Sequence, residues 1–239
     1  MRELLIFFNP IENFWPWVLP LSDVHLIASH FDHRPLSDAE FARYGVPLPS
    51  NIQRAAHKRR AEFLAGRLCA QQALLMLNGT VGIPAIRQDR APQWPQGCIG
   101  SITHSDRWAA ALVAQYDKYI ALGLDIERCL SISDSRKLAD GILTAGEHSR
   151  WAQLPSEQFS LMVTLTFSLK ESLFKALYPL VGKRFYFEHA ELVDWNMTTG
   201  TARLRLLTNL DSEWQAGREL ETYFCQVDEH IMSLVVVPS

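Results

Sequence analysis

The chain has 239 residues, a length that suits one large domain or two domains of about 100–150 residues each. Its hydrophobic content of 48% and charged content of 21% are those of an ordinary soluble globular protein. The net charge of −3 argues against a protein whose whole surface binds nucleic acid. The four cysteines lie far apart and form no CxxC pair, which argues against a zinc knuckle or a redox dithiol.

The N-terminal segment MRELLIFFNP contains a short apolar run that ends at Asn9-Pro10. This run is too short for the core of a signal peptide, and no run in the chain approaches the roughly 20 residues of a membrane span. We therefore expect a cytoplasmic protein that does not enter a membrane. Further along, VHLIASHF (24–31) is compatible with an edge strand.

A long helix is predicted between the basic segment HKRR and Asn78-Gly79. Apolar residues such as Ala61, Leu64 and Leu68 recur there at helical spacing, and Asn-Gly is a common helix end. The pattern predicts an amphipathic helix of about 20–25 residues.

The middle of the chain reads as a loop (83–97) and then as strands. CIGSITH (98–104) and WAAALVA (108–114) flank a short polar turn and predict a hairpin, and KYIALGLDIE (118–127) predicts another strand. Thr144 and Glu147 form a capping box that predicts a helix start.

The last part predicts a second major helix followed by strands. The helix covers TFSLKESLFKALYPLV (166–181), and the strands cover 182–195, 201–207, 222–227 and 231–237, the last two joined as a hairpin. This order predicts an α+β fold of two similar halves, an N-terminal half at 1–123 and a C-terminal half at 124–239.

Two carboxylates lie in the segment GLDIE. Because side chains alternate along a strand, Asp125 and Glu127 point to the same side and need a cation or a shared proton. Carboxylate oxygens suit Mg²⁺, which often bridges substrate phosphates, and Mn²⁺ accepts the same ligands. A solvated strand end explains the same spacing about equally well.

Glu171 and Lys175 lie four residues apart on the second major helix. Spacing alone favours a structural interpretation, because Ser168 and Glu171 match a capping box and Glu171 with Lys175 matches a surface ion pair. The alternative is a phosphate-handling site, since a helix N-terminus also attracts anions.

Other polar residues add to these candidate site residues. His104 lies at a strand end beside Ser101 and Thr103, with neither a metal-binding partner nor a hydrolase motif nearby. On the long helix, Arg60 and Arg67 share a face and Arg59 lies about a quarter-turn away. Arginine matches phosphate oxygens, although a solvated basic face or a contact with RNA explains the run as well.

Taken together, the carboxylates, the lysine, the histidine and the arginines fit a Mg²⁺-dependent transfer that involves a polyphosphate substrate. In addition, GLDIE (123–127) and FSLKESLFK (167–175) resemble the paired motifs GxDxE and [FW]xxKExxxK of the Sfp-type 4'-phosphopantetheinyl transferases. The segments RRAEFLAGRLCA, RAPQWP and GSITH resemble the enterobactin-synthase branch of that family, and FLAGRLCA resembles the broad-acting carrier protein synthases of pseudomonads. The resemblance covers about residues 50–190.

The resemblance implies two α+β halves related by a pseudo-twofold axis, with coenzyme A bound as co-substrate. It implies a monomeric enzyme that moves the phosphopantetheine arm of coenzyme A to a serine of an apo acyl carrier protein or peptidyl carrier domain. Adenosine 3',5'-bisphosphate would leave.

Roles follow from the matching motif positions. Asp125, Glu127 and Glu171 would hold Mg²⁺, with Asp125 also on the coenzyme A side. Glu171 would be the general base, directly or through a water, and Lys175 would stabilise the phosphates. The remaining nucleotide contacts would come from Arg59, Arg67, Arg90, Ser101, Thr103 and His104.

Three other interpretations stay open at this point. A Mg²⁺-dependent nucleotide phosphohydrolase would use the same carboxylates. An RNA-binding module would use the arginine-rich helix but leaves the carboxylates unexplained. A catalytically idle scaffold protein would not need the intact acidic and lysine positions.

Overall fold

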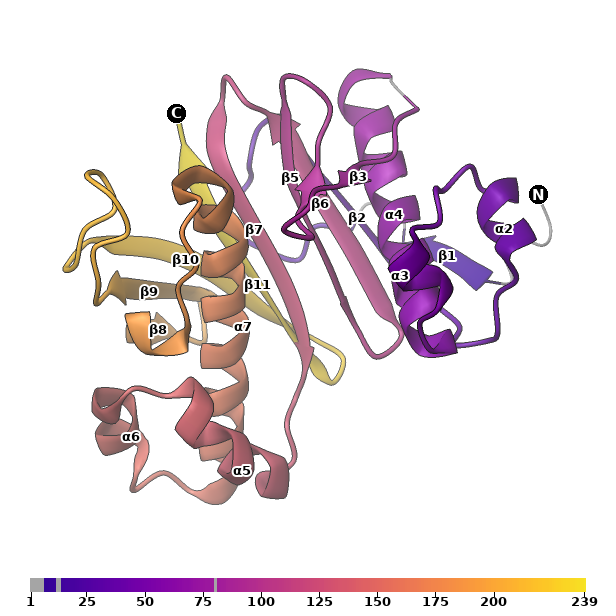
Figure 1. Cartoon of the computed structure of the whole chain (residues 1–239). Helices are drawn as coiled ribbons and strands as arrows, with labels where there is room; N and C mark the ends of the chain where they lie inside the picture. Colours follow the sequence, from indigo (N-terminus) through magenta and orange to yellow (C-terminus); the bar gives the residue numbers. More distant parts are fainter. Residues whose placement is uncertain (1–6, 12–13, 80) are drawn as a thin grey trace. The chain divides into compact units, whose positions relative to one another are not determined.

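The computed structural model describes residues 7–11, 14–79 and 81–239 (Figure 1). Helices and antiparallel sheets are mixed along the chain, and the predicted α+β class is confirmed. The chain forms two compact units. Unit 1 takes in the described residues up to Trp15, together with Leu21–Ile120 and Ser239, and unit 2 takes in Pro16–Pro20 and Ala121–Pro238.

The sheet of unit 1 has four strands in the order β1-β2-β6-β5. They are β1 (Phe8–Ile11), β2 (Val24–Phe31), β6 (Trp108–Gln115) and β5 (Cys98–Ser105), and neighbours run antiparallel. The predicted β5–β6 hairpin is confirmed. The expectation that 24–31 is an edge strand was wrong, because β1 pairs with its outer side.

Helix α4 (His57–Asn78) packs against the sheet of unit 1. It has 22 residues and ends at Gly79, which adopts a φ of 71° that glycine tolerates best. Ala61 and Leu64 are fully buried against the strands. The predicted long helix and its end are therefore confirmed.

Short elements complete unit 1. Helices α2 (Asp38–Arg43) and α3 (Ser50–Gln53) precede α4, and the strands β3 (Ala85–Ile86) and β4 (Pro92–Gln93) form a small antiparallel pair. The segment expected to be a plain loop therefore contains a two-stranded turn, which positions Arg90 in its bend.

The sheet of unit 2 has five strands in the order β7-β11-β10-β9-β8. They are β7 (Tyr119–Arg128), β11 (His230–Pro238), β10 (Glu219–Val227), β9 (Thr201–Leu206) and β8 (Ala190–Asn196). The predicted hairpin is confirmed, since Val227 of β10 pairs with His230 of β11. The strand predicted over 182–195 was wrong in its first half, where a short 3₁₀ turn, η1 (Phe187–His189), precedes β8.

Helix α7 (Ser156–Val181) is the long helix of unit 2 and packs against β11. It begins ten residues before the predicted start at Thr166. In Figure 1, α5 (Ile132–Ile142) and α6 (Ala145–Trp151) lie beside the N-terminal half of α7. Sequence analysis did not identify α5. No helix in the described part of the chain is both long and apolar enough to cross a membrane.

The two predicted capping boxes have different outcomes. At α6, Thr144 N–H donates to Glu147 Oε2 at 2.7 Å, and Glu147 N–H donates to Thr144 Oγ1 at 3.2 Å, as predicted. The box at Ser168 and Glu171 was wrong, because Ser168 lies inside α7 and its hydroxyl contacts Ser233 Oγ at 2.8 Å.

Candidate active site

In unit 2, Asp125 of β7 and Glu171 and Lys175 of α7 form a group that we call the acidic cluster, and Glu127 lies two residues after Asp125 on β7. Asp125 is 2% exposed, and its Oδ1 accepts a hydrogen bond from Lys175 Nζ at 2.5 Å. The same ammonium group donates to the carbonyl oxygen of Leu124 at 3.2 Å. Lys175 is therefore paired with the strand, not with Glu171 as the helix spacing suggested.

Glu171 lies one helical turn before Lys175 and shares its environment. Burial raises the pKa of the Glu171 carboxyl, Lys175 opposes that shift, and the negative charge of Asp125 adds to it. The raised pKa makes Glu171 a stronger base than a carboxylate in water. A group of this kind can accept a proton from a hydroxyl group placed next to it.

Helix α7 approaches β7 closely enough to bring Asp125, Glu171 and Lys175 together. A Cβ atom on Gly123 would lie 1.9 Å from the carbonyl oxygen of Ser172, so only glycine fits there. On the same helix, Ser172 Oγ lies 2.7 Å from Ser233 Oγ and donates to the Ser233 carbonyl at 3.0 Å. The glycine of the GLDIE segment thus sets the spacing of the acidic cluster, a role that sequence analysis did not assign.

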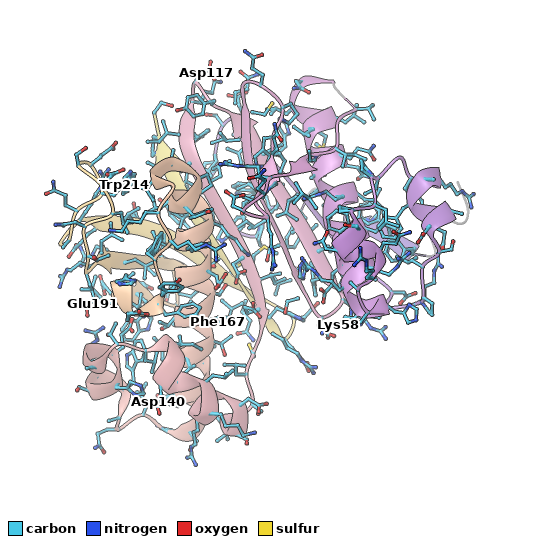
Figure 2. All side chains as sticks on the ribbon, in the orientation of Figure 1. Lys58, Asp117, Asp140, Phe167, Glu191 and Trp214 are labelled. Atoms are coloured by element: carbon cyan, nitrogen blue, oxygen red, sulfur yellow. The ribbon has the colours of Figure 1, made fainter. Side chains whose placement is uncertain are left out.

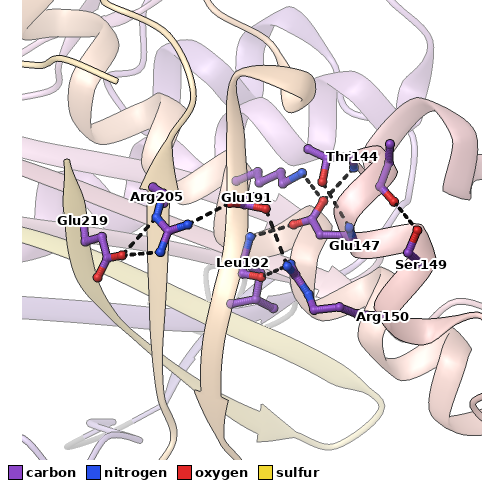
Figure 3. Close-up of polar contacts among 10 residues, drawn as sticks. Thr144, Glu147, Ser149, Arg150, Glu191, Leu192, Arg205 and Glu219 are labelled. Carbon is purple, nitrogen blue, oxygen red and sulfur yellow. Dashed lines mark hydrogen bonds and ion pairs between the residues drawn. The ribbon is translucent and has the colours of Figure 1, made fainter. Parts of the chain in front are cut away.

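A buried ion pair between Lys170 and Glu147 anchors α7 at the residue before Glu171, and Figure 3 shows the polar contacts of Glu147. Lys170 Nζ donates to Glu147 Oε2 at 2.7 Å and to the Ile142 carbonyl at 2.8 Å, and the side chains of both ionic partners are nearly inaccessible. The other oxygen of Glu147 accepts the Leu192 N–H at 2.6 Å. Burial lowers the pKa of Lys170, and the charge of Glu147 opposes that shift. These bonds join α7 to α6 and β8, so they hold the helix that carries Glu171.

A pocket of about 150 Å³ opens beside Glu171 within unit 2. Half of its lining residues are aromatic, and its charged groups are two helix residues and one arginine. Its lining consists of Lys170, Glu171, Phe174, Arg184, Phe185, Tyr186, Phe187 and Ala190. The pocket suits a slender, partly apolar group whose end reaches Glu171.

Unit 1 has a second pocket of about 270 Å³, which we call the arginine pocket. Cationic groups from α4, β5 and the β3–β4 turn meet there, above an apolar floor. Its charged and titratable lining residues are Arg59, Glu62, Arg67, Arg90 and His104. The sequence therefore identified four of these five residues, and it missed Glu62, which lies one helical turn after Arg59.

Arg67 is the most buried cation of the arginine pocket, with 6% exposure. Its guanidinium stacks 4.9 Å from the centre of the Phe63 ring, and no carboxylate in the described residues forms an ion pair with it. Burial and the charge of Arg59 lower its pKa to about 10. Because a buried cation without a counter-ion is costly, this pocket favours an anionic ligand.

The other predicted contacts of unit 1 lie differently. Ser101 and Thr103 are buried on β5, and neither lines the arginine pocket, because strand alternation turns them away from the side that carries His104. Arg60 binds Asp38 Oδ1 at 2.7 Å and the Gln53 carbonyl at 2.9 Å. Arg60 therefore holds α4 to the preceding segment, which agrees with its absence from the expected nucleotide contacts.

The acidic cluster contains only part of the ligand set of a metal site. Among the described residues, no three acidic, histidine or cysteine side chains lie close enough together to hold a metal ion by themselves. Lys175 takes the position of a cation at Asp125. The donor chemistry still fits Mg²⁺, which commonly uses only one or two protein carboxylates and completes its shell with water and substrate phosphates.

Comparison with known families covers most of the chain. Residues 49–114 match the sequence model of the 4'-phosphopantetheinyl transferase N-terminal domain. Residues 121–235 match that of the 4'-phosphopantetheinyl transferase superfamily.

Two individual relatives match most of the chain. Enterobactin synthase component D of Escherichia coli K12 is 33% identical over 215 residues, which are 88% of this chain and 97% of the relative. The 4'-phosphopantetheinyl transferase Svp of Streptomyces mobaraensis is 35% identical over 192 residues, which are 72% of this chain and 73% of the relative. Among solved structures, a holo-ACP-synthase from Plasmodium yoelii covers 51% of this chain and 95% of its own, with 15% identity and a TM-score of 0.37.

Proposed function

Since this chain belongs to the 4'-phosphopantetheinyl transferase superfamily, we propose how its two pockets carry out the transfer. As a holo-carrier protein synthase, it moves a phosphopantetheine arm to a carrier protein. We propose that coenzyme A is the donor, that the reaction needs Mg²⁺, and that adenosine 3',5'-bisphosphate leaves. The observation that carries this proposal is the placement of Glu171 and Lys175 of α7 against Asp125 of β7.

Mg²⁺, or Mn²⁺ in its place, would take one or two ligands from Asp125, Glu127 and Glu171 and the others from water and the substrate phosphates, because the three carboxylates do not form a ligand set by themselves among the described residues. When bound, the metal would neutralise negative charge on the pyrophosphate oxygens. Lys175 supplies a fixed positive charge at the same carboxylate, 2.5 Å from Asp125 Oδ1. Its ammonium group would also stabilise the leaving phosphate, because positive charge placed where negative charge develops lowers the barrier.

Glu171 is the proposed general base. It would accept the proton of the carrier serine as the serine oxygen attacks the phosphorus atom that bears the pantetheine arm. The raised pKa of Glu171 suits this role, since a base works best when its pKa approaches the working pH. The buried Lys170–Glu147 pair would keep the helix of Glu171 in place.

The pocket of about 150 Å³ beside Glu171 is the proposed binding site of the pantetheine arm. A slender chain with two amides and methyl groups fits a narrow pocket walled by Phe174, Phe185 and Phe187. Binding in this pocket would place the phosphate end of the arm at Glu171.

The arginine pocket is the proposed site of the 3'-phosphate of coenzyme A. Arg59, Arg67, Arg90 and His104 line it, and Arg67 has no acidic partner in the described residues. Arginines provide charge-assisted hydrogen bonds that match phosphate oxygens. The expected nucleotide contacts of Ser101 and Thr103 stay predictions.

The acceptor is proposed to be an apo acyl carrier protein or a peptidyl carrier domain, and the enzyme is proposed to act as a monomer in the cytoplasm. No role for nucleic acid or membranes is proposed. A hydrolytic reaction at the same carboxylates is the competing outcome of the experiment below.

Intact mass spectrometry of an apo acyl carrier protein, incubated with this protein, coenzyme A and Mg²⁺, tests the proposal. We expect a gain of roughly 340 Da, one phosphopantetheine group, that disappears with EDTA. A peptidyl carrier domain run in parallel would show the range of acceptors. Release of adenosine 3',5'-bisphosphate without any gain on either carrier would instead indicate hydrolysis.

A further inference from the structure

Glu62 is an acidic residue in a pocket that otherwise gathers positive charge. It lies on α4, is 8% exposed, and is the one carboxylate among the described residues that line the arginine pocket. Its Oε2 lies 3.4 Å from Arg59 Nη1 and 3.6 Å from His104 Nδ1, and its Oε1 lies 3.9 Å from Lys58 Nζ. A carboxylate there repels an incoming phosphate, so its position calls for an explanation.

The contacts of His104 identify its tautomer. Arg59 Nη1 lies 2.6 Å from His104 Nε2, and arginine can only donate hydrogen bonds. Nε2 of His104 is therefore the acceptor, and the ring proton is on Nδ1, which faces Glu62. A neutral ring in this state offers a lone pair, not a hydrogen, to the pocket.

A phosphate dianion accepts hydrogen bonds and therefore needs hydrogen-bond donors. The protonation state of His104 must therefore change when the ligand binds. If Arg59 turns to the phosphate, Nε2 of His104 becomes free to take a proton from solvent and to donate it in a hydrogen bond. The positive charges of Arg59, Arg67 and Arg90 oppose this protonation, and Glu62 favours it. The carboxylate behind Nδ1 is thus the group that lets the ring become a cation.

We propose that Glu62 is a positioning residue that keeps His104 ready to be protonated, and that it thereby extends recognition of the 3'-phosphate to higher pH. The ligand class is a phosphomonoester dianion on a nucleotide. This inference rests on the proposed role of the arginine pocket.

The experiment compares the affinities of coenzyme A and 3'-dephospho-coenzyme A for the full chain by isothermal titration calorimetry in EDTA. The pH range of about 5.5 to 9 covers the ordinary pKa of histidine and the second ionisation of a phosphate. The preference for coenzyme A in the unsubstituted protein should decline at high pH. In Glu62→Gln the decline should begin about one pH unit lower, because the ring has lost its negative partner.

Matched variants separate this effect from a structural one. His104→Asn should lower the preference and leave only the ionisation of the phosphate itself, and adding Glu62→Gln to it should produce no further shift with pH. Asp117→Asn removes an equal charge from the exposed turn between β6 and β7 (Figure 2) and should leave the profile unchanged. Equal melting temperatures of the variants would show that each is folded.

If the Glu62→Gln profile coincides with that of the unsubstituted protein, the inference is overturned and the phosphate site remains intact. If the preference for coenzyme A instead falls by the same factor at every pH, the inference is also overturned and Glu62 has a structural role. If the unsubstituted protein does not distinguish the two ligands, and Arg67→Ala changes neither affinity, the proposed role of the arginine pocket itself is wrong.

Discussion

The arginine pocket of unit 1 and the acidic cluster of unit 2 differ in whether their buried charges have an ionic partner. In unit 2, Asp125 is paired with Lys175, and Glu147 is paired with Lys170. In unit 1, Arg67 is buried over an aromatic ring without an acidic partner in the described residues. Paired charges hold a chemical group in one geometry, whereas an uncompensated cation favours a ligand that brings its own negative charge.

The comparison predicts that a substitution in the acidic cluster changes turnover most. Glu171→Gln keeps the size of the side chain and removes its basicity, so we expect kcat to fall about 10²–10⁴-fold. The assay is the initial rate of carrier modification at saturating coenzyme A. Binding of coenzyme A in EDTA should change little, and full activity of the variant would exclude Glu171 as the base.

A buried pair should be more sensitive to the loss of one partner than an exposed pair. Glu147→Gln leaves the ammonium of Lys170 buried without its counter-charge, and we expect the free energy of unfolding to fall by about 3–5 kcal/mol. Chemical denaturation measures this change. Adding Lys170→Met should restore part of the loss.

The exposed pair of Lys137 and Asp134 on α5 provides the control, and Lys137→Gln should alter stability little. If Glu147→Gln and Lys137→Gln had similar effects, the buried pair would not be what anchors α7.

The close approach of α7 to β7 predicts a smaller but specific effect. Gly123→Ala places a methyl group on the carbonyl of Ser172, and such overpacking typically costs about 1–3 kcal/mol. The displaced helix should also lower kcat, since Glu171 and Lys175 move with it. Denaturation and initial rates together measure both effects.

Gly141→Ala is the matched control, because nothing lies within 4 Å of the added methyl group. Because Gly141 lies in the last turn of α5, the substitution should stabilise the protein by less than the roughly 1 kcal/mol of a helix interior. A neutral Gly123→Ala would contradict the packing argument.

The arginine pocket should affect binding and not chemistry. Arg67→Ala removes a charged hydrogen-bond donor, so we expect KM for coenzyme A to rise about ten- to a hundredfold with kcat nearly unchanged. The affinity for 3'-dephospho-coenzyme A should barely change. Lys137→Ala, which removes an exposed cation from α5, serves as the control. Equal losses for both ligands would place Arg67 away from the 3'-phosphate.

Local patterns in the sequence predicted elements well where the chemistry is local. Gly79 ends α4 and the Thr144–Glu147 box begins α6, because each depends on groups within a few residues. The Ser168–Glu171 pattern failed because a capping box needs the first turn of a helix. Helix α7 already begins at Ser156, so Ser168 lies in its interior. The edge position expected for β2 failed because β1, a short strand with Pro10, pairs with it.

The sequence by itself determined the α+β class, the main helices, most strands and the inventory of carboxylates, lysine, histidine and arginines. These follow from side-chain periodicity and from motif spacing, which are properties of neighbouring residues. Only the tertiary structure decided which groups meet. It paired Lys175 with Asp125, brought Arg90 to the same pocket as Arg59 and Arg67, and placed Glu62 behind His104. Such pairings depend on contacts between residues distant in sequence, and these form only when helix and strand pack together.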